Sequence, residues 1–329
     1  DDAGRTLLVT KTPFQGADSA AATSLMLLPQ GVEAPQGFSG QLLAEAPRRI
    51  VCLSSTHVAM LEKLGLADRV VGVSGFDYIT SPAVRGRAAE VADIGYDGNF
   101  DYEKLISVKP DLVMLYGVNA PNEMEPRLRR LGIPFVYIGD YLEPSPLGKA
   151  EWLVAVGAIT GTLDKARELY ADIPRRYMAI KQMADSAASR PKVMLNTPYG
   201  DQWVMASTDS YLAALIRDAG GDYLWHQGGN ASRPIDLEQA YSLVNQCDLW
   251  LNPGAFRTLA ELKRALPKFA DTPVMRDGKV FNNTARMSPS GANDYWESGL
   301  VNPDVVLRDL YSIFHGGDDA NLIYYEHLK

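Results

Sequence analysis

The chain has 329 residues and carries 32 Lys and Arg against 40 Asp and Glu, a formal net charge of -8. At about 150 residues per domain, this length predicts about two domains. Its 46% hydrophobic and 22% charged residues are typical of an ordinary folded protein. Because an acidic surface has little long-range attraction for phosphate backbones or anionic lipid, we expect no nucleic-acid partner and no membrane-surface binding.

The first 46 residues predict a β-rich extension. Two short β-prone runs at 6–10 and 23–28 are separated by a loop rich in Gly, Ala, Ser and Asp. This spacing predicts a hairpin-like pair packed on a larger body. The chain begins Asp1-Asp2-Ala3 without Met or an apolar signal core, which indicates a processed form whose export signal is absent from this sequence.

After Pro47 short apolar runs alternate with helical segments. Strands are predicted at 49–53, 70–73, 112–116 and 135–138, with helices at 56–64 and 122–131. This alternation predicts a parallel, doubly wound α/β sheet.

From Pro146 the chain is predicted to be helical, first over 147–159 and then over 163–188. At 1.5 Å per residue, the second helix could extend roughly 39 Å, the span of a small domain. Its apolar residues recur at spacings of three and four, so one stripe packs against another element. They are Ala166, Leu169, Ile173, Tyr177, Ile180 and Met183.

After Arg190-Pro191 the strand-and-helix alternation restarts and partly repeats the first half. The run from Asp101 to Leu115 matches the run from Asp236 to Leu251, with a capped helix, a turn and an Asp that leads into a buried strand. The simplest explanation is two similar α/β lobes joined by one long helix.

Searches for catalytic motifs find no nucleophile elbow, Walker lysine loop, dinucleotide-binding glycine motif or zinc-binding helix. The four histidines (His57, His226, His315 and His327) show no metal-ligand spacing, and the thiols of Cys52 and Cys247 are expected to be buried and free. We therefore expect no enzyme, no resident cofactor and no metal site.

Ligands of open α/β sheets bind beyond the carboxyl ends of the strands, so the loops there are expected to carry the binding residues. Nearly every such loop carries an aromatic side chain or an arginine. Two lobes facing each other with such loops would form a cleft for a large, flat or polyphenolic ligand. The candidate ligand-binding residues are His57, Phe76, Tyr78, Tyr116, Tyr141, Tyr199, Trp203, Arg257 and Arg286.

Each candidate also has a purely structural interpretation. A tyrosine after a strand often packs at the sheet edge, and His57 could simply begin a helix capped by Ser55 or Thr56. Arg257 and Arg286 could form local ion pairs. The apolar neighbours of Trp203 are equally consistent with core packing. Only the clustering of these residue types favours a binding site.

An ordered series of motifs over about 270 residues resembles a known family. It includes 47–56 (PRRIVCLSST), 64–74 (LGLADRVVGVS), Lys109-Pro110-Asp111 and Ala219-Gly220-Gly221. The series is similar to the substrate-binding proteins of ABC importers for ferric siderophores, haem and cobalamin. The resemblance implies a class III periplasmic binding protein fold with an N-terminal α/β lobe (47–162), a bridging helix (163–189) and a C-terminal α/β lobe with its tail (190–329). The β-rich extension (1–46) lies outside the family pattern.

The resemblance also implies docking to an ABC permease, with its ATPase, through one acidic residue in each lobe. Glu103 falls at the matching position of the first lobe. At the matching position of the second lobe stands Arg217, followed by Asp218, so the expected acid is Asp218 or is missing.

The family implies capture of a small metal chelate, with a ferric siderophore or haem ranked first and cobalamin second. Haem would need an axial Tyr or His, for which His57, Tyr78 or Tyr199 would serve. Aromatic walls from Trp203, Tyr116 and Phe76 would suit cobalamin. The expected location is the periplasm or cell envelope, either free or held by a lipid anchor. The protein is expected to be a monomer. The alternatives are a bilobal enzyme such as a tetrapyrrole metal chelatase, using His57 or His226, and a sensory module that binds a partner through residues 1–46.

Overall fold

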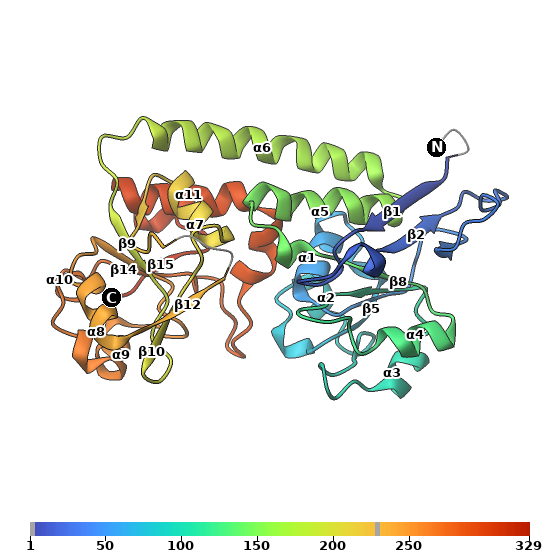
Figure 1. Ribbon diagram of the computed structural model, residues 1–329, viewed down its shortest axis with the longest axis horizontal. Coiled ribbons are helices and arrows are strands. Elements are labelled where there is room, and N and C mark those ends of the chain that lie inside the picture. Colours follow the sequence, from blue (N-terminus) through green and yellow to red (C-terminus); the bar gives the residue numbers. More distant parts are fainter. Residues whose placement is uncertain (1–3, 228–230) are drawn as a thin grey trace. The chain divides into compact units, whose positions relative to one another are not determined.

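The computed structural model describes residues 4–227 and 231–329 and separates the chain into two compact units (Figure 1). The first unit runs to Glu143 and adds Gly148–Asp172 and Trp296–Val301. The second unit comprises Pro144–Leu147, Ile173–Tyr295 and Asn302–Lys329. Each unit contains its own sheet, and the predicted α/β class with a β-rich extension is confirmed.

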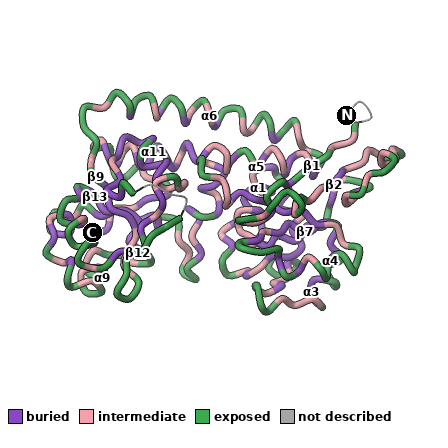
Figure 2. The backbone as a smooth tube through the Cα atoms, viewed as in Figure 1, coloured by how far each residue is buried: buried purple, intermediate pink, exposed green. Residues whose placement is uncertain are grey.

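The main sheet of the first unit is parallel throughout, in the order β6-β5-β4-β7-β8. Its strands are almost wholly buried, as expected when helices cover both faces (Figure 2). The strands are β4 (Ile50–Cys52), β5 (Val70–Val73), β6 (Ala92–Asp93), β7 (Leu112–Leu115) and β8 (Phe135–Tyr137). The accompanying helices are α1 (Ser55–Lys63), α2 (Pro82–Arg85), α3 (Tyr102–Ser107), α4 (Glu125–Leu131) and α5 (Pro146–Ile159).

The second unit repeats this scheme with the strand order β11-β9-β13-β14-β15, in which only β15 runs antiparallel. A separate antiparallel pair, β10 with β12, was not predicted. The strands are β9 (Lys192–Leu195), β10 (Gln202–Met205), β11 (Asp222–Tyr223), β12 (Arg233–Asp236), β13 (Leu249–Leu251), β14 (Val280–Asn282) and β15 (Glu326–His327). The helices are α7 (Tyr211–Asp218), α8 (Leu237–Val244), α9 (Leu259–Ala265), α10 (Pro273–Arg276) and α11 (Pro303–His315).

Helix α6 (Leu163–Asp185) corresponds to the predicted bridging helix and is one continuous element of 23 residues (Figure 1). It begins in the first unit and ends in the second. The predicted stripe is buried at Ala166, Ile173, Tyr177 and Ile180, whereas Met183 is exposed because Ala184 takes the inward position.

The chain also crosses between the units at two other segments, Pro144–Leu147 and Trp296–Val301, which the sequence did not predict. Trp296–Val301 belongs to the first unit although the chain on either side of it belongs to the second. The buried carboxylate of Glu297 accepts the backbone N–H groups of Thr80 at 2.6 Å and Ser81 at 2.9 Å, which fixes this segment at the start of α2.

The N-terminal extension is part of the first unit rather than a separate domain. The predicted pair, β1 (Thr6–Thr10) with β2 (Thr23–Leu27), is antiparallel, and β3 (Gln41–Leu43) adds a parallel third strand. The side-chain amide of Gln41 donates to the carbonyl of Phe135 and accepts its N–H, both at 2.9 Å. Thr10 donates its hydroxyl to the carbonyl of Tyr137 at 2.9 Å. The extension therefore satisfies the backbone of edge strand β8, which would otherwise be open to unwanted pairing.

Helix α1 places His57 in the core of the first unit. The helix is capped by Ser54, whose hydroxyl accepts the Thr56 N–H at 3.3 Å, and not by Ser55 or Thr56. The His57 side chain is fully buried, and neither ring nitrogen has a hydrogen-bond partner of normal geometry. Burial lowers the pKa of His57 to about 3, with only partial opposition from the Met114 backbone.

We predict that Gln41→Ala lowers the free energy of unfolding by about 1–3 kcal/mol, because the variant leaves a backbone N–H and a carbonyl of β8 without partners. Urea denaturation would measure the change. Gln30→Ala, at an exposed position in the same extension, should stay within about 0.5 kcal/mol of the parent and serves as the control. Equal stability of the two variants would contradict a role of the extension in covering β8.

We also predict that His57 makes folding sensitive to acid. Between the ordinary pKa of 6.5 and about 3, the unfolded chain binds a proton that the folded chain excludes. This difference makes stability fall as pH falls, by up to about 1.4 kcal/mol per pH unit. In His57→Leu this contribution is missing, so the parent-minus-variant difference in unfolding free energy should fall from about pH 6.5 to about pH 4. Parallel pH profiles of parent and variant would contradict the assignment.

Candidate functional site

The carboxyl ends of β5, β6 and β7 bring aromatic side chains together in the first unit. Tyr78 is 59% exposed and Tyr96 is 45% exposed, and their rings meet edge to face with centroids 5.9 Å apart. Gly75, at φ 71°, allows this approach, because a Cβ there would lie 2.4 Å from the Tyr96 ring. Tyr96 was not predicted from the sequence, although its position after a short strand of the same sheet was a usable signal.

Phe76, Tyr116 and Tyr141 are half-buried at the same end of this sheet. The Phe76 ring lies 5.6 Å from the guanidinium of Arg85. Tyr116 donates its hydroxyl to Asp97 at 3.5 Å. The hydroxyl of Tyr141 lies against the carbonyl oxygens of Gly117 and Val118, so it holds a loop in place. Phe76 and Tyr116 therefore keep a partly open ring, whereas the polar end of Tyr141 is already used.

Two predicted binding residues lie in the cores of their units. His57 has no exposed surface, and Trp203 packs with Trp250 and Phe269 and donates its indole N–H to the Leu195 carbonyl at 2.8 Å. In this structure neither side chain reaches the surface, which favours the structural interpretation of both.

The second unit exposes the other candidates at its strand ends. Tyr199, in the turn before β10, is 90% exposed. Arg257 is exposed and donates to the Met287 carbonyl at 3.3 Å. Arg286 forms an ion pair with Asp294 at 2.8 Å and lies over the ring of Tyr324. The charge of Arg286 is thus compensated within the unit.

Two asparagines that the sequence analysis missed follow β9 and β13. Asn196 and Asn252 adopt left-handed backbone conformations, with φ of 64° and 54°. Asparagine tolerates this region better than most residues, and such conformations are frequent at functional sites. The two residues shape the turns that carry Tyr199 and Arg257.

The two predicted docking acids differ sharply in accessibility. Glu103 is exposed in the first turn of α3. Asp218 is only 7% exposed, and its carboxylate accepts a hydrogen bond from Tyr177 at 2.9 Å and pairs with Lys181. The Asp218 carboxylate is therefore occupied inside the second unit and is not presented to a partner.

Glu238 occupies the position in the second unit that Glu103 occupies in the first. Helix α3 is capped by Asp101 and α8 by Asp236, and each cap accepts the N–H three residues on, at 2.9 Å and 2.7 Å. Each glutamate follows its cap by two residues and is exposed. The internal repeat contained this signal, because it aligns Asp101 with Asp236.

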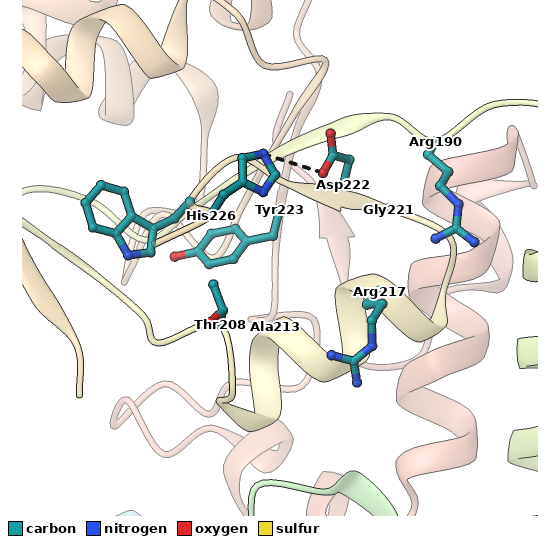
Figure 3. A pocket seen from close by; sticks show the side chains of 9 residues that line it. Arg190, Thr208, Ala213, Arg217, Gly221, Asp222, Tyr223 and His226 are labelled. Carbon is teal, nitrogen blue, oxygen red and sulfur yellow. Dashed lines mark ion pairs between the residues drawn. The ribbon is translucent and has the colours of Figure 1, made fainter. Parts of the chain in front are cut away.

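A pocket of about 320 Å³ lies beside edge strand β11 in the second unit and contains none of the predicted ligand-binding residues (Figure 3). Its walls include Arg190, Arg217 and His226. Each of these has an acidic neighbour, with Asp185 and Asp218 3.4 Å from the two arginines and Asp222 3.9 Å from His226. The pocket therefore has no strong net charge to attract an ion.

Residues 4–227 and 231–329 contain no cluster of three or more His, Cys, Asp or Glu side chains placed to hold a metal ion. The helices of this part of the chain include none that is both long and apolar enough to span a bilayer. The two cysteines are buried free thiols.

Comparisons with known proteins agree with the fold. The chain is 25% identical over 282 residues to an uncharacterized lipoprotein of Methanocaldococcus jannaschii, covering 81% of this chain and 65% of the relative. It is 28% identical over 220 residues to a cobalamin-binding protein of Halobacterium salinarum, covering 65% of this chain and 55% of the relative. The chain thus spans less than two thirds of either relative. The structure superposes on the apo periplasmic heme-binding protein RhuT from Roseiflexus sp. RS-1 with a TM-score of 0.64 and 22% identity, covering 82% and 98% of the two chains.

The family model described as "Periplasmic binding protein" matches residues 50–285, which is more than half of the chain. The match includes most of both main sheets, the whole of α6 and every candidate ligand-binding residue except Arg286. The chain therefore belongs to the periplasmic binding protein family.

Proposed function

We propose that the protein is the substrate-binding component of an ABC importer in the cell envelope and that it delivers a metal chelate to a membrane permease. The observation that carries the proposal is the exposed Tyr78–Tyr96 pair, which stands where ligands of such sheets bind. Exposed aromatic rings offer apolar faces for a macrocycle and hydroxyl groups for its substituents. The names of the cobalamin-binding and heme-binding relatives support this ligand class.

The ranking of ferric chelates before cobalamin loses part of its support in this structure. It rested on His57, Tyr78 or Tyr199 as an axial ligand for haem, and on Arg257, Arg286 and the tyrosines for siderophores. His57 is buried, and Arg286 is paired with Asp294. We therefore propose a metal chelate without that ranking, with Tyr78 and Tyr199 as the exposed phenols available to it.

The alternatives lose support for similar reasons. A metal chelatase would have depended on His57 or His226 as its working group. His57 is in the core, and His226 lines the pocket beside β11 in the second unit, with Asp222 as its acidic neighbour. Residues of the extension cover β8, so they have a structural role that needs no partner protein.

We further propose that Glu103 and Glu238 are the two acids that contact the permease. The apolar side chain beside each glutamate also recurs, on α3 in the first unit and on α8 in the second. Ile106, three residues after Glu103, is 43% exposed, and Tyr241, three residues after Glu238, is 44% exposed. Residues three apart share a helix face, so each unit presents one carboxylate beside one apolar side chain.

The ligand proposal predicts that haemin, cyanocobalamin or a ferric siderophore binds with a dissociation constant below about 10 μM, equivalent to about 6.8 kcal/mol. Tryptophan fluorescence and ligand absorbance would measure binding. Tyr78→Ala should weaken it at least about tenfold, because a stacking ring is worth about 0.5–1.5 kcal/mol beyond its buried area. Tyr241→Ala, at a comparably exposed tyrosine on α8, is the control.

Tyr78→Phe separates the two roles of this residue. If the ring only stacks, Phe should keep most of the affinity, whereas a phenol that ligates a metal should lose its absorbance signature in the same variant. Failure of all three chelates to bind would refute the proposed function.

The docking proposal predicts that Glu103→Ala and Glu238→Ala retain chelate affinity but each reduces uptake through the cognate permease and ATPase in proteoliposomes, with a larger loss in the double variant. The physical reason is the loss of an exposed charge that meets a cation on the permease. Glu168→Ala, an exposed acid on α6, is the control. Unchanged uptake in the double variant would contradict the assignment, as would lost chelate affinity in either single variant.

A further inference from the structure

Carboxylates surround the exposed aromatic pair at the carboxyl ends of β5 and β6. Asp77 is exposed and stands next to Tyr78 in sequence. Asp97 follows Tyr96 and accepts the Tyr116 hydroxyl and the Asn122 amide, both at 3.5 Å. Glu123 lies close to Asp97 and accepts the N–H of Gly98 at 2.7 Å. The loops that would meet a ligand here therefore carry several negative charges within one small surface.

Asp93 adds a fourth carboxylate beneath the pair. It accepts the backbone N–H groups of Gly75 and Phe76 at 3.1 Å and of Gly95 at 3.0 Å. These bonds stabilise its negative charge and hold the two loops that carry Tyr78 and Tyr96. Asp93 is thus a fixed charge that cannot move away when a ligand arrives.

The cations Arg85 and Lys104 lie close to this surface and are already engaged, and Arg127 lies over the ring of Tyr102, which is also close to Glu123. Arg85 stacks on Phe76 and donates to the Ile79 carbonyl at 3.0 Å. Lys104 pairs with Asp101 at 3.5 Å and donates to the Asp93 carbonyl oxygen at 3.4 Å. Asp77, Asp93 and Asp97 are the carboxylates nearest the rings of Tyr96 and Tyr116, and they outnumber Arg85 and Lys104, which leaves this part of the surface negative.

The tyrosine hydroxyls respond to this field. Partial desolvation, together with Asp93, Tyr78 and Asp77, raises the pKa of Tyr96. Burial and the neighbouring Asp97 raise the pKa of Tyr116. Both phenols therefore stay neutral and act as hydrogen-bond donors and ring faces, and neither adds a phenolate.

We propose that Tyr78 and Tyr96, framed by Asp77 and Asp97, select a planar ligand that is neutral or positively charged and disfavour polyanionic ligands. This inference rests on the proposed capture of a chelate and specifies its charge class. Like charges repel at this surface, while the two open rings supply a stacking platform that is indifferent to the ligand's central metal. Ferric chelates with several anionic groups are therefore poor candidates for this surface, and uncharged or cationic macrocycles are good ones.

The test uses two macrocycles with the same flat core and opposite charge. The full chain is titrated with tetra(N-methylpyridinium)porphyrin, which is cationic, and with tetra(sulfonatophenyl)porphyrin, which is anionic, and absorbance changes report binding. We expect the cationic probe to bind at least about tenfold more tightly at an ionic strength of about 0.1 M, where charges within about 10 Å still interact. Raising the salt concentration should reduce the difference in affinity between the two porphyrins, because salt screens the charges.

Variants separate this surface from the overall net charge of -8. The double variant Asp77→Asn with Asp97→Asn should shrink the difference between the probes at least about threefold, because the negative field of the surface is reduced. Asp68→Asn removes an exposed acid before β5, at the opposite end of the same sheet, and should leave the difference unchanged. Tyr96→Ala should weaken the cationic probe at least about threefold, and Tyr96→Phe should retain most of its affinity, since stacking needs the ring and not the hydroxyl.

Tighter or equal binding of the anionic probe would overturn the inference. The inference would also be overturned if the Asp68 variant and the double variant changed the affinity difference between the probes equally. The preference for the cationic probe would then come from the net charge of the whole protein alone. The chelate titrations keep this outcome distinct from failure of the proposed function. If the chain binds haemin or cyanocobalamin but shows no preference between the porphyrins, only the charge inference is wrong. If it binds neither the chelates nor the porphyrins, the proposed function and the charge inference are both wrong.

Discussion

Parallel pairing of the strands is the constraint on which the rest of each unit depends. In the first unit β4 pairs in parallel with β5 and β7, and in the second unit β9 pairs in parallel with β11 and β13. Parallel strands place all their carboxyl ends at one edge, and helices that cover both faces leave that edge as the open part of the sheet. Tyr78, Tyr96 and Tyr116 come from three separate loops and still gather because of this geometry.

At the opposite edge of each sheet, where the strands begin, an aspartate accepts backbone N–H groups at the start of a neighbouring strand. Asp111 accepts the backbone N–H groups of Arg48 and Arg49 at the start of β4, and Asp248 accepts the N–H of Lys192 at the start of β9. Each aspartate stands just before the strand that pairs with the one it holds. The same repeat carries the caps of α3 and α8, so the position of Glu238 follows from hydrogen bonding at a helix start. The family resemblance, which led to Asp218, did not take this equivalence into account.

The sequence predicted the architecture better than the site. Periodicity located most of the main strands and α6, because buried strands and a long amphipathic helix have strong local patterns. It missed β10, where burial alternates from exposed Val204 to buried Trp203 and Met205. Recognising that strand would have placed Trp203 inward. The burial of His57 and Asp218 could not be read from the sequence for a different reason. It depends on helix packing and on partners such as Tyr177, which lie far away in sequence.

The electrostatic potential at the strand-end loops of each unit depends on which charged side chains form ion pairs. Arg286 could have made an anion site in the second unit, yet Asp294 and the ring of Tyr324 already engage its guanidinium. In the first unit the Asp97 carboxylate accepts hydrogen bonds from two neutral donors, the Tyr116 hydroxyl and the Asn122 amide. A neutral donor leaves a carboxylate with its full charge, whereas an ion pair cancels most of the field at a distance. The sign of the potential at each set of loops is thus decided by the type of partner each charged group has found, which composition alone does not contain.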